Sequence, residues 1–224
     1  MSNARRPSCV LQAAMTLAAA CICSLLAPAV SAGATQENTT QFSVIAGSLS
    51  FSTAPTVPSL GSVTLNGQAQ TTNATMNNFA VDDATGSGSG WNVTVEGQSG
   101  TGKSVVFATY CPKSKCGTES EGYVTGGATL PANSLTLNST GASFSAQNGS
   151  TGTAPTLQCA TACDVDHPSA VKIVSAAKEA GMGTWQVSGF SATSLALATP
   201  STLKVPSNEE VYRVNLLWTL STGP

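Results

Sequence analysis

The sequence has few charged side chains and a single histidine, and these shortages exclude several functions. Asp, Glu, Lys and Arg make up 9% of the 224 residues, with nine basic residues against eleven acidic ones. Without an excess of positive charge, the chain has no net electrostatic attraction for nucleic acid. No serine stands in a nucleophile-elbow context, so the one histidine, His167, completes no evident Ser-His-Asp triad. The composition therefore predicts a protein that is not an enzyme and binds no nucleic acid.

Long hydrophobic runs are absent from most of the chain, but one stands near the N-terminus. Two arginines precede an apolar run that ends at a small-residue cleavage site, Val30-Ser31-Ala32. This is the pattern of a secretory signal peptide, and Pro28 near the end of the run disfavours the alternative, a single membrane anchor. We expect residues 1–32 to be removed and the protein to be secreted. About 190 residues then remain, with a net charge of −4 because Arg5 and Arg6 leave, and no membrane span.

Few cysteines remain once the signal peptide is removed. Four of the seven lie beyond residue 32, as the close pairs Cys111 with Cys116 and Cys159 with Cys163. An even number in an exported chain predicts two disulfides, and the short spacings favour pairing within each pair. The alternative is a metal site that would combine the cysteines with the side chains of Asp164, Asp166 and His167, but zinc–thiolate sites belong to reducing compartments. We expect disulfides, and no metal or other cofactor.

Helical periodicity is almost absent, and short extended segments take its place. The segments are rich in Val, Thr, Leu and aromatic residues, and turn-forming residues separate them, as in an all-β sandwich or barrel. One short helix is expected at residues 168–181, between a proline and a glycine. We therefore predict a linker at residues 33–41 and a single β-sandwich or barrel-like domain at 42–224. The expected strands are 42–52, 61–67, 91–97, 103–110, 133–139, 142–147, 184–190, 194–199 and 210–220.

Two glycine-rich segments resemble functional motifs or flexible turns. Residues 97–104, "GQSGTGKS", match the phosphate-binding pattern G-x-x-x-x-G-K-[ST]. A phosphate site needs a helix directly after this pattern, whereas the β-branched and aromatic "VVFATY" follows. We therefore expect a hairpin loop from Gly97 to Ser104 and no nucleotide. Residues 84–90, "ATGSGSG", read as a flexible turn, and the preceding Asp82 and Asp83 as a solvated turn or a weak cation loop.

Aromatic residues make up only 5% of the chain, so the context of its three tryptophans is informative. Each is followed two positions later by an aliphatic residue, in Trp91-x-Val93, Trp185-x-Val187 and Trp218-x-Leu220. On a strand, such residues share one face. The face either packs into the core or forms an exposed aromatic platform for sugar rings or a partner protein.

Four stretches together resemble the WxL domain of bacterial surface proteins over about residues 42–224. They are "FSVIAGSLSFSTAP", "FAVDDATGSGSGWNVTV", "AAKEAGMGTWQV" and "YRVNLLWTLSTGP". In the last stretch Tyr212, Leu217, Trp218, Leu220 and Pro224 match the family's terminal motif, whereas the proximal motif reads Trp91-x-Val93 in place of Trp-x-Leu.

The resemblance implies a secreted protein that binds the bacterial cell wall non-covalently, with peptidoglycan as the implied ligand. Both motifs would be needed, so the implied wall-binding residues are Trp91, Val93, Tyr212, Trp218 and Leu220. Other surface proteins of the same system are implied partners. We expect "NLLWTL" to form a central strand. The alternative function is a structural subunit of an extracellular fibre, matrix or surface complex, because the strands carry few of the lysines and prolines that protect exposed sheet edges.

Overall fold

The structure is a computed structural model that describes residues 36–207 and 210–224. The predicted signal peptide, residues 1–32, lies outside the described residues. Residues 44–224 form one compact unit. In the other unit, the described residues 36–43 are exposed and have no regular secondary structure.

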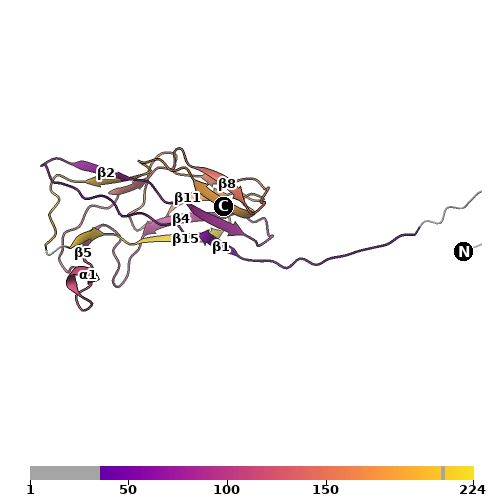
Figure 1. Cartoon of the computed structure of the whole chain (residues 1–224), viewed down its shortest axis with the longest axis horizontal. Helices are drawn as coiled ribbons and strands as arrows, with labels where there is room; N and C mark the ends of the chain where they lie inside the picture. The colour runs from indigo at the N-terminus through magenta and orange to yellow at the C-terminus, as the bar shows by residue number, and fades with distance from the viewer. Residues whose placement is uncertain (1–35, 208–209) are drawn as a thin grey trace, which may run out of the picture. The chain divides into compact units, whose positions relative to one another are not determined.

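The regular secondary structure of the described residues is almost entirely antiparallel strand, which confirms the predicted all-β class. Four small sheets have the strand orders β1-β3-β12-β8, β10-β7-β13-β2, β15-β4-β11-β9 and β14-β5-β6. One helix of four residues, α1, accompanies them (Figure 1). The elements are β1 Leu49–Thr53, β2 Gln70–Ala74, β3 Phe79–Asp83, β4 Trp91–Gly97, β5 Ala108–Cys111, α1 Lys113–Cys116, β6 Gly122–Tyr123, β7 Leu135–Leu137, β8 Ser143–Gln147, β9 Thr156–Leu157, β10 Cys163–Asp164, β11 Val171–Ala176, β12 Gly183–Ser188, β13 Leu195–Thr199, β14 Val211–Arg213 and β15 Leu216–Thr222.

A single hydrophobic core joins the sheets. Buried side chains from β3, β4, β7, β11, β12 and β13 belong to one contiguous cluster. Strand β4 shows how the sequence builds it, because its residues alternate strictly between buried and half-buried positions. Trp91, Val93 and Val95 point into the core, and the polar residues between them point away. Burying each large apolar side chain contributes about 1.5–3 kcal/mol.

The helix predicted at residues 168–181 is wrong, because six of these fourteen residues form strand β11 and none of them is helical. The β-branched run from Val171 to Val174 pairs with β4 on one side and with β9 on the other. A register shift between Lys172 and Val174 marks a bulge, and Ile173 and Val174 are both buried next to it. Pairing on both edges therefore overrides the weak helical spacing.

Two other local predictions also fail. Residues 61–67 form no strand; β2 begins later, at Gln70. The loop at 97–104 is not a hairpin, since β4 and β5 belong to different sheets. It holds a turn in which the Lys103 N–H donates to the Gly100 carbonyl, and no helix begins until Lys113. The context that a phosphate site requires after the motif is therefore missing.

Both cysteine pairs are disulfides in the structure, as the spacing predicted. Cys111 is bonded to Cys116 and Cys159 to Cys163, with Cα–Cα distances of 5.9 and 5.5 Å. The first disulfide encloses α1, beside β5 (Figure 1). The second lies between β9 and β10 and has one fully buried cysteine, Cys159. The first bond therefore ties α1 to the end of β5, the central strand of its sheet, and the second ties the chain after β9 to β10, an edge strand.

The acidic pair before the glycine-rich loop is part of strand β3, which corrects the solvated-turn reading. Asp83 is buried, and its carboxylate accepts hydrogen bonds from the backbone N–H and the hydroxyl of Thr85. Asp82 accepts a hydrogen bond from the hydroxyl of Thr184 on the neighbouring strand. The two carboxylates thus hold the loop entrance and the sheet together.

The loop at 84–90 ends in a glycine that the packing requires. Gly90 has a φ of 74°, and a Cβ there would overlap the carbonyl oxygen of Ala176 and lie 2.7 Å from that of Ala177. Gly86 has a φ of 65°, but nothing lies within 4 Å of its would-be Cβ.

We expect Gly90→Ala to lower the free energy of unfolding by about 2–4 kcal/mol, because a left-handed backbone and an overlap act together. The control Gly86→Ala introduces only the backbone cost, about 1 kcal/mol. Urea denaturation of the two variants measures the difference. Equal losses would mean that the chain around Gly90 relaxes freely.

Candidate functional site

The two tryptophan motifs lie on adjacent strands and pair with each other. In the antiparallel pair β4–β15, Leu220 stands opposite Val93 and Trp218 opposite Val95. Directly opposed residues share a face, so both motifs point their large side chains to the same side of the sheet. The structure therefore brings together four of the five predicted wall-binding residues, from positions more than a hundred residues apart.

Trp91 and Val93 form the buried half of this pair. Both are 0% exposed. The indole Nε1 of Trp91 donates a hydrogen bond to the carbonyl of Gly181 at 3.0 Å, so its one polar group is satisfied inside the core. Because neither side chain has exposed surface, neither touches a ligand in this conformation. Of the two readings of the motif, core packing describes these residues.

Trp218 and Leu220 form the half-buried part of the pair. The Trp218 ring packs against Phe79 of β3, with ring centroids 6.2 Å apart. Among the strands of residues 36–207 and 210–224, β15 has a partner on one side only, so the central position predicted for "NLLWTL" is wrong. The central positions go to β4 and β11, which bury residues along most of their length. On β15 alternate residues are exposed instead, including Leu217.

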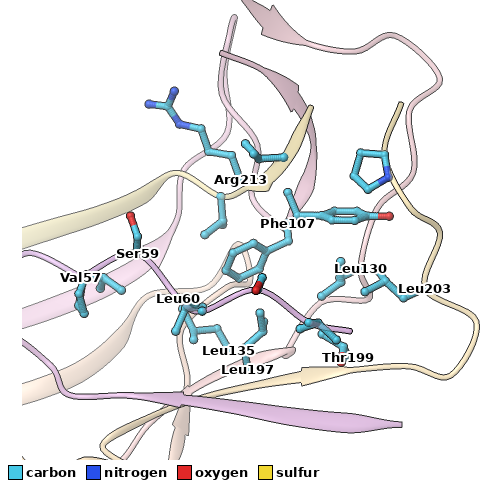
Figure 2. A pocket seen from close by; sticks show the side chains of 18 of the residues that line it. Val57, Ser59, Leu60, Phe107, Leu130, Leu135, Leu197, Thr199, Leu203 and Arg213 are labelled. Atoms are coloured by element: carbon cyan, nitrogen blue, oxygen red, sulfur yellow. The ribbon is translucent and has the colours of Figure 1, made fainter. Parts of the chain in front are cut away.

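A large cavity opens beside Trp218, and we call it the groove. Its volume is about 930 Å³, at the upper end of the range for small-molecule sites. In Figure 2, Phe107 lies at its centre, and Leu60, Leu135 and Leu197 gather on one side. The irregular segment 55–63 forms one wall. The groove is lined by Pro55–Val63, Leu65, Phe107, Leu130, Leu135, Leu197, Thr199, Leu203–Pro206, Glu210–Val214, Leu216 and Trp218.

Tyr212, the fifth predicted wall-binding residue, lines the same groove from β14. Its hydroxyl donates a hydrogen bond to the carbonyl of Lys204 at 2.8 Å. Burial raises the pKa of Tyr212, so the hydroxyl keeps its proton at neutral pH and remains a donor. A second hollow of about 780 Å³ shares Tyr212, Glu210 and the segment 203–206 with the groove. Tyr212 therefore borders both recesses.

Three charged side chains belong to the groove lining, and two of them, Lys204 and Arg213, are exposed. Lys204, Glu210 and Arg213 are in its lining. The guanidinium carbon of Arg213 lies 4.3 Å from the centre of the Tyr110 ring, and in Figure 2 this side chain points away from the leucines. The hydrogen bond from the Tyr110 hydroxyl to Glu121 is the main cause that raises the pKa of Tyr110, and burial adds to it. The groove thus has an apolar interior with donors and acceptors of both charges at its rim.

The residues considered for a metal site have structural roles instead. Asp166 is fully buried, and its two carboxylate oxygens accept the backbone N–H groups of Ser134 and Leu135 at the start of β7. Burial raises the pKa of Asp166, and these two donors oppose the shift. His167 accepts a hydrogen bond from the Ser169 N–H. Within residues 36–207 and 210–224, no group of three or more Cys, His, Asp and Glu side chains is placed to hold a metal ion.

The sequence did not reveal the groove, because its walls come from four distant parts of the chain. Segment 55–63 has no regular secondary structure and no periodic pattern. The prolines and apolar residues of "PTVPSL" were the one sign in the sequence that this segment lies over a hydrophobic surface. In the part of the chain that the structure describes, no helix is long and apolar enough to cross a membrane.

Comparison with known proteins gives one match. Residues 28–224 match the family model described as "WxL domain surface cell wall-binding". The match covers both tryptophan motifs, Tyr212 and the whole groove lining. No curated protein and no solved structure matches the chain.

Proposed function

Because the chain belongs to the WxL family of surface cell wall-binding domains, we propose that it attaches non-covalently to the bacterial cell wall and that peptidoglycan is the polymer it binds. The protein is secreted, residues 1–32 are removed, and the mature protein then attaches to the wall. The protein acts without catalysis, in the company of other surface proteins of the same system. The family match over nearly the whole chain carries this proposal.

The groove is the part of the surface that we assign to peptidoglycan. Tyr212 and Trp218 are both in its lining, whereas Trp91 and Val93 are fully buried. Aromatic rings at a recess offer flat apolar faces to sugar rings, and the Tyr212 hydroxyl, which donates its proton to the Lys204 carbonyl, can still accept a hydrogen bond from a sugar hydroxyl. Lys204 and Arg213 at the rim suit the carboxylates of a stem peptide. Because the chain has so few charges, it must recognise a polymer mainly by shape and hydrogen bonds. A recess can offer both.

Within this proposal the two motifs have different tasks. Trp91 and Val93 hold β4 in the core, and β4 in turn holds β15, which carries Trp218. The buried motif therefore keeps the shape of the groove, and Tyr212 and Trp218, which line it, make the contact.

Sedimentation with purified peptidoglycan tests the assignment of the groove. We expect the wild-type protein to appear in the pellet, and Tyr212→Leu to bind at least about fivefold more weakly, because truncating an aromatic contact at a binding site costs more than about 1 kcal/mol. Tyr123→Leu is the matched control. Tyr123 is also half-buried and its hydroxyl also donates a hydrogen bond, to Asn215, but it does not line the groove.

Two outcomes of this experiment would contradict the proposal. A wild-type protein that stays in the supernatant would contradict direct binding to peptidoglycan. Equal binding by Tyr212→Leu and the wild type would place the wall contact outside the groove.

A structural subunit of an extracellular assembly is the second candidate function. The observation that favours it is the outer edge of β15, where no further strand is paired. The residues that face outward there, Leu217, Thr219 and Ser221, are exposed and uncharged. Such an edge lacks the charges that usually prevent pairing between molecules.

A further inference from the structure

The exposed large hydrophobic side chains of this protein are gathered in two places. Within residues 36–207 and 210–224 there are seven of them. Three stand close together near the start of the domain: Phe42, Val44 and Ile45 are 90%, 81% and 92% exposed. We call residues 42–46 the arm. Single exposed apolar residues are common on protein surfaces, but three such side chains within four residues are not.

Three of the remaining four lie at the groove. Leu65, Val205 and Val211 are exposed and belong to its lining. Val205 is 78% exposed although it stands next to an apolar cavity. The seventh, Leu217, faces outward on β15. One chain therefore has a projecting apolar peptide and a recess with an apolar rim, and in neither place are these side chains covered.

We propose that the arm of one copy of this protein occupies the groove of a second copy. The arm has no strand partner, and no charged residue occurs from Asn38 to Ser48. It therefore suits an apolar recess. Strand β14, which lines the groove, is an edge strand with a partner on one side only. An extended peptide that docks beside such an edge gains backbone hydrogen bonds, while its apolar side chains enter the recess.

The direction of the chain favours a second copy over the same copy. The backbone N–H of Gly47 donates to the carbonyl of Ala84, which ties the end of the arm to the Leu49 end of β1. The groove wall, 55–63, begins just past the other end of β1, after Thr53. The arm has five residues, which span at most about 18 Å when fully extended. To enter its own groove, the arm would have to reverse and run back along the full length of β1.

The proposed contact has a definite consequence for assembly. Arm and groove are different surfaces of one chain, so each copy has one of each and the contact is head-to-tail. Such contacts form open chains of molecules, or rings if the geometry closes. This association needs no peptidoglycan, since it involves the protein alone, but because both proposals fill the groove, a docked arm and bound peptidoglycan compete for it.

Sedimentation velocity of the purified protein without peptidoglycan tests the proposal. We expect the average mass of the wild type to rise with concentration, from that of one copy to that of two or more. The arm variant Phe42→Asp/Ile45→Asp and the groove variant Leu65→Asp/Val205→Asp should each remain single copies. All four positions are exposed, so the folded domain should tolerate these changes. An equimolar mixture of the two variants should form dimers and nothing larger, because one intact arm and one intact groove remain.

The matched control is Gln41→Asp/Ser43→Asp, which adds the same charge within and directly before the arm but keeps the arm's apolar side chains. It should associate like the wild type. The proposal is overturned if the wild type stays a single copy at all concentrations, if the arm variant associates as the wild type does, or if the control loses association equally. Failure of peptidoglycan binding would leave these results unchanged, so the two proposals are tested separately.

Discussion

Replacing Trp91 by alanine should lower the free energy of unfolding by about 3–5 kcal/mol, a large share of the 5–15 kcal/mol typical of a domain. The side chain is fully buried between neighbours on two strands, with Ala176 opposite it on β11 and Thr222 opposite it on β15. Its removal leaves a cavity in the core. It also leaves the carbonyl of Gly181 without its donor, which adds the cost of an unsatisfied buried acceptor. Urea denaturation followed by far-ultraviolet circular dichroism measures the loss.

Trp218→Ala is the matched variant, since it removes the same side chain from the partner motif. Trp218 is half-buried, so we expect a smaller loss, about 1–2 kcal/mol. A loss for Trp218→Ala as large as that for Trp91→Ala would contradict the division of the motifs into a buried half and a groove-facing half. In that case both tryptophans would act chiefly by holding the core.

This division could not be predicted from the sequence, although the strands themselves could. The alternation of Trp91, Val93 and Val95 with polar residues indicated a strand with one buried face, and the structure has that strand as β4. The same alternation in β15 does not say whether a further strand pairs beyond it. Burial depends on this, because an edge strand keeps one side open while a central strand is covered on both. The local sequence pattern therefore indicates which residues share a face of the strand, but it does not indicate how deeply that face is buried.

Competition between local and long-range interactions explains the wrong helix. The segment 168–181 has a proline at its start, a glycine at its end and apolar residues at helical spacing. In the structure its β-branched residues pair with β4, in which Val93 stands opposite Val174. That partner lies about eighty residues away, so no window of sequence contains it. The bulge at Ile173 further disturbs the period-two pattern from which a strand would have been recognised.

The groove could not be predicted from the sequence for the same reason, because long-range interactions form it. Leu135 and Leu197 stand opposite each other on adjacent strands of one sheet, whereas Phe107 comes from the chain just before β5, and each alone reads as an ordinary core residue. The disulfides, by contrast, were predictable, because each joins cysteines only four or five residues apart. These two local bonds were recovered from the sequence, whereas the recess formed between the sheets was not.

Deletion of residues 215–224 should prevent folding, because it removes β15 and one complete side of β4. The seven residues of β15 pair with all seven of β4, from Leu216 opposite Gly97 to Thr222 opposite Trp91. Without them, the buried edge of β4 loses its backbone partners and Val93 loses the cover of Leu220. Burial of Leu216, Trp218 and Leu220 contributes about 3–6 kcal/mol in total when their partial exposure is taken into account, which is comparable to the stability of a whole domain. The near-ultraviolet circular dichroism spectrum of the truncated protein should show no native tertiary signal.

A shorter truncation after Thr222 separates the strand from its end. It removes only Gly223 and Pro224, and with them the hydrogen bond from the Gly223 N–H to Gly90 and the one from the Asn92 side chain to the Gly223 carbonyl. Each such bond contributes about 0.5–1.5 kcal/mol, so this variant should fold with reduced stability. A native spectrum for the longer deletion would mean that β15 is an appended peptide on a core that is complete without it. An edge strand can be such an appendage only if the strand behind it tolerates water, and Trp91, Val93 and Val95, which are all fully buried, indicate that β4 does not.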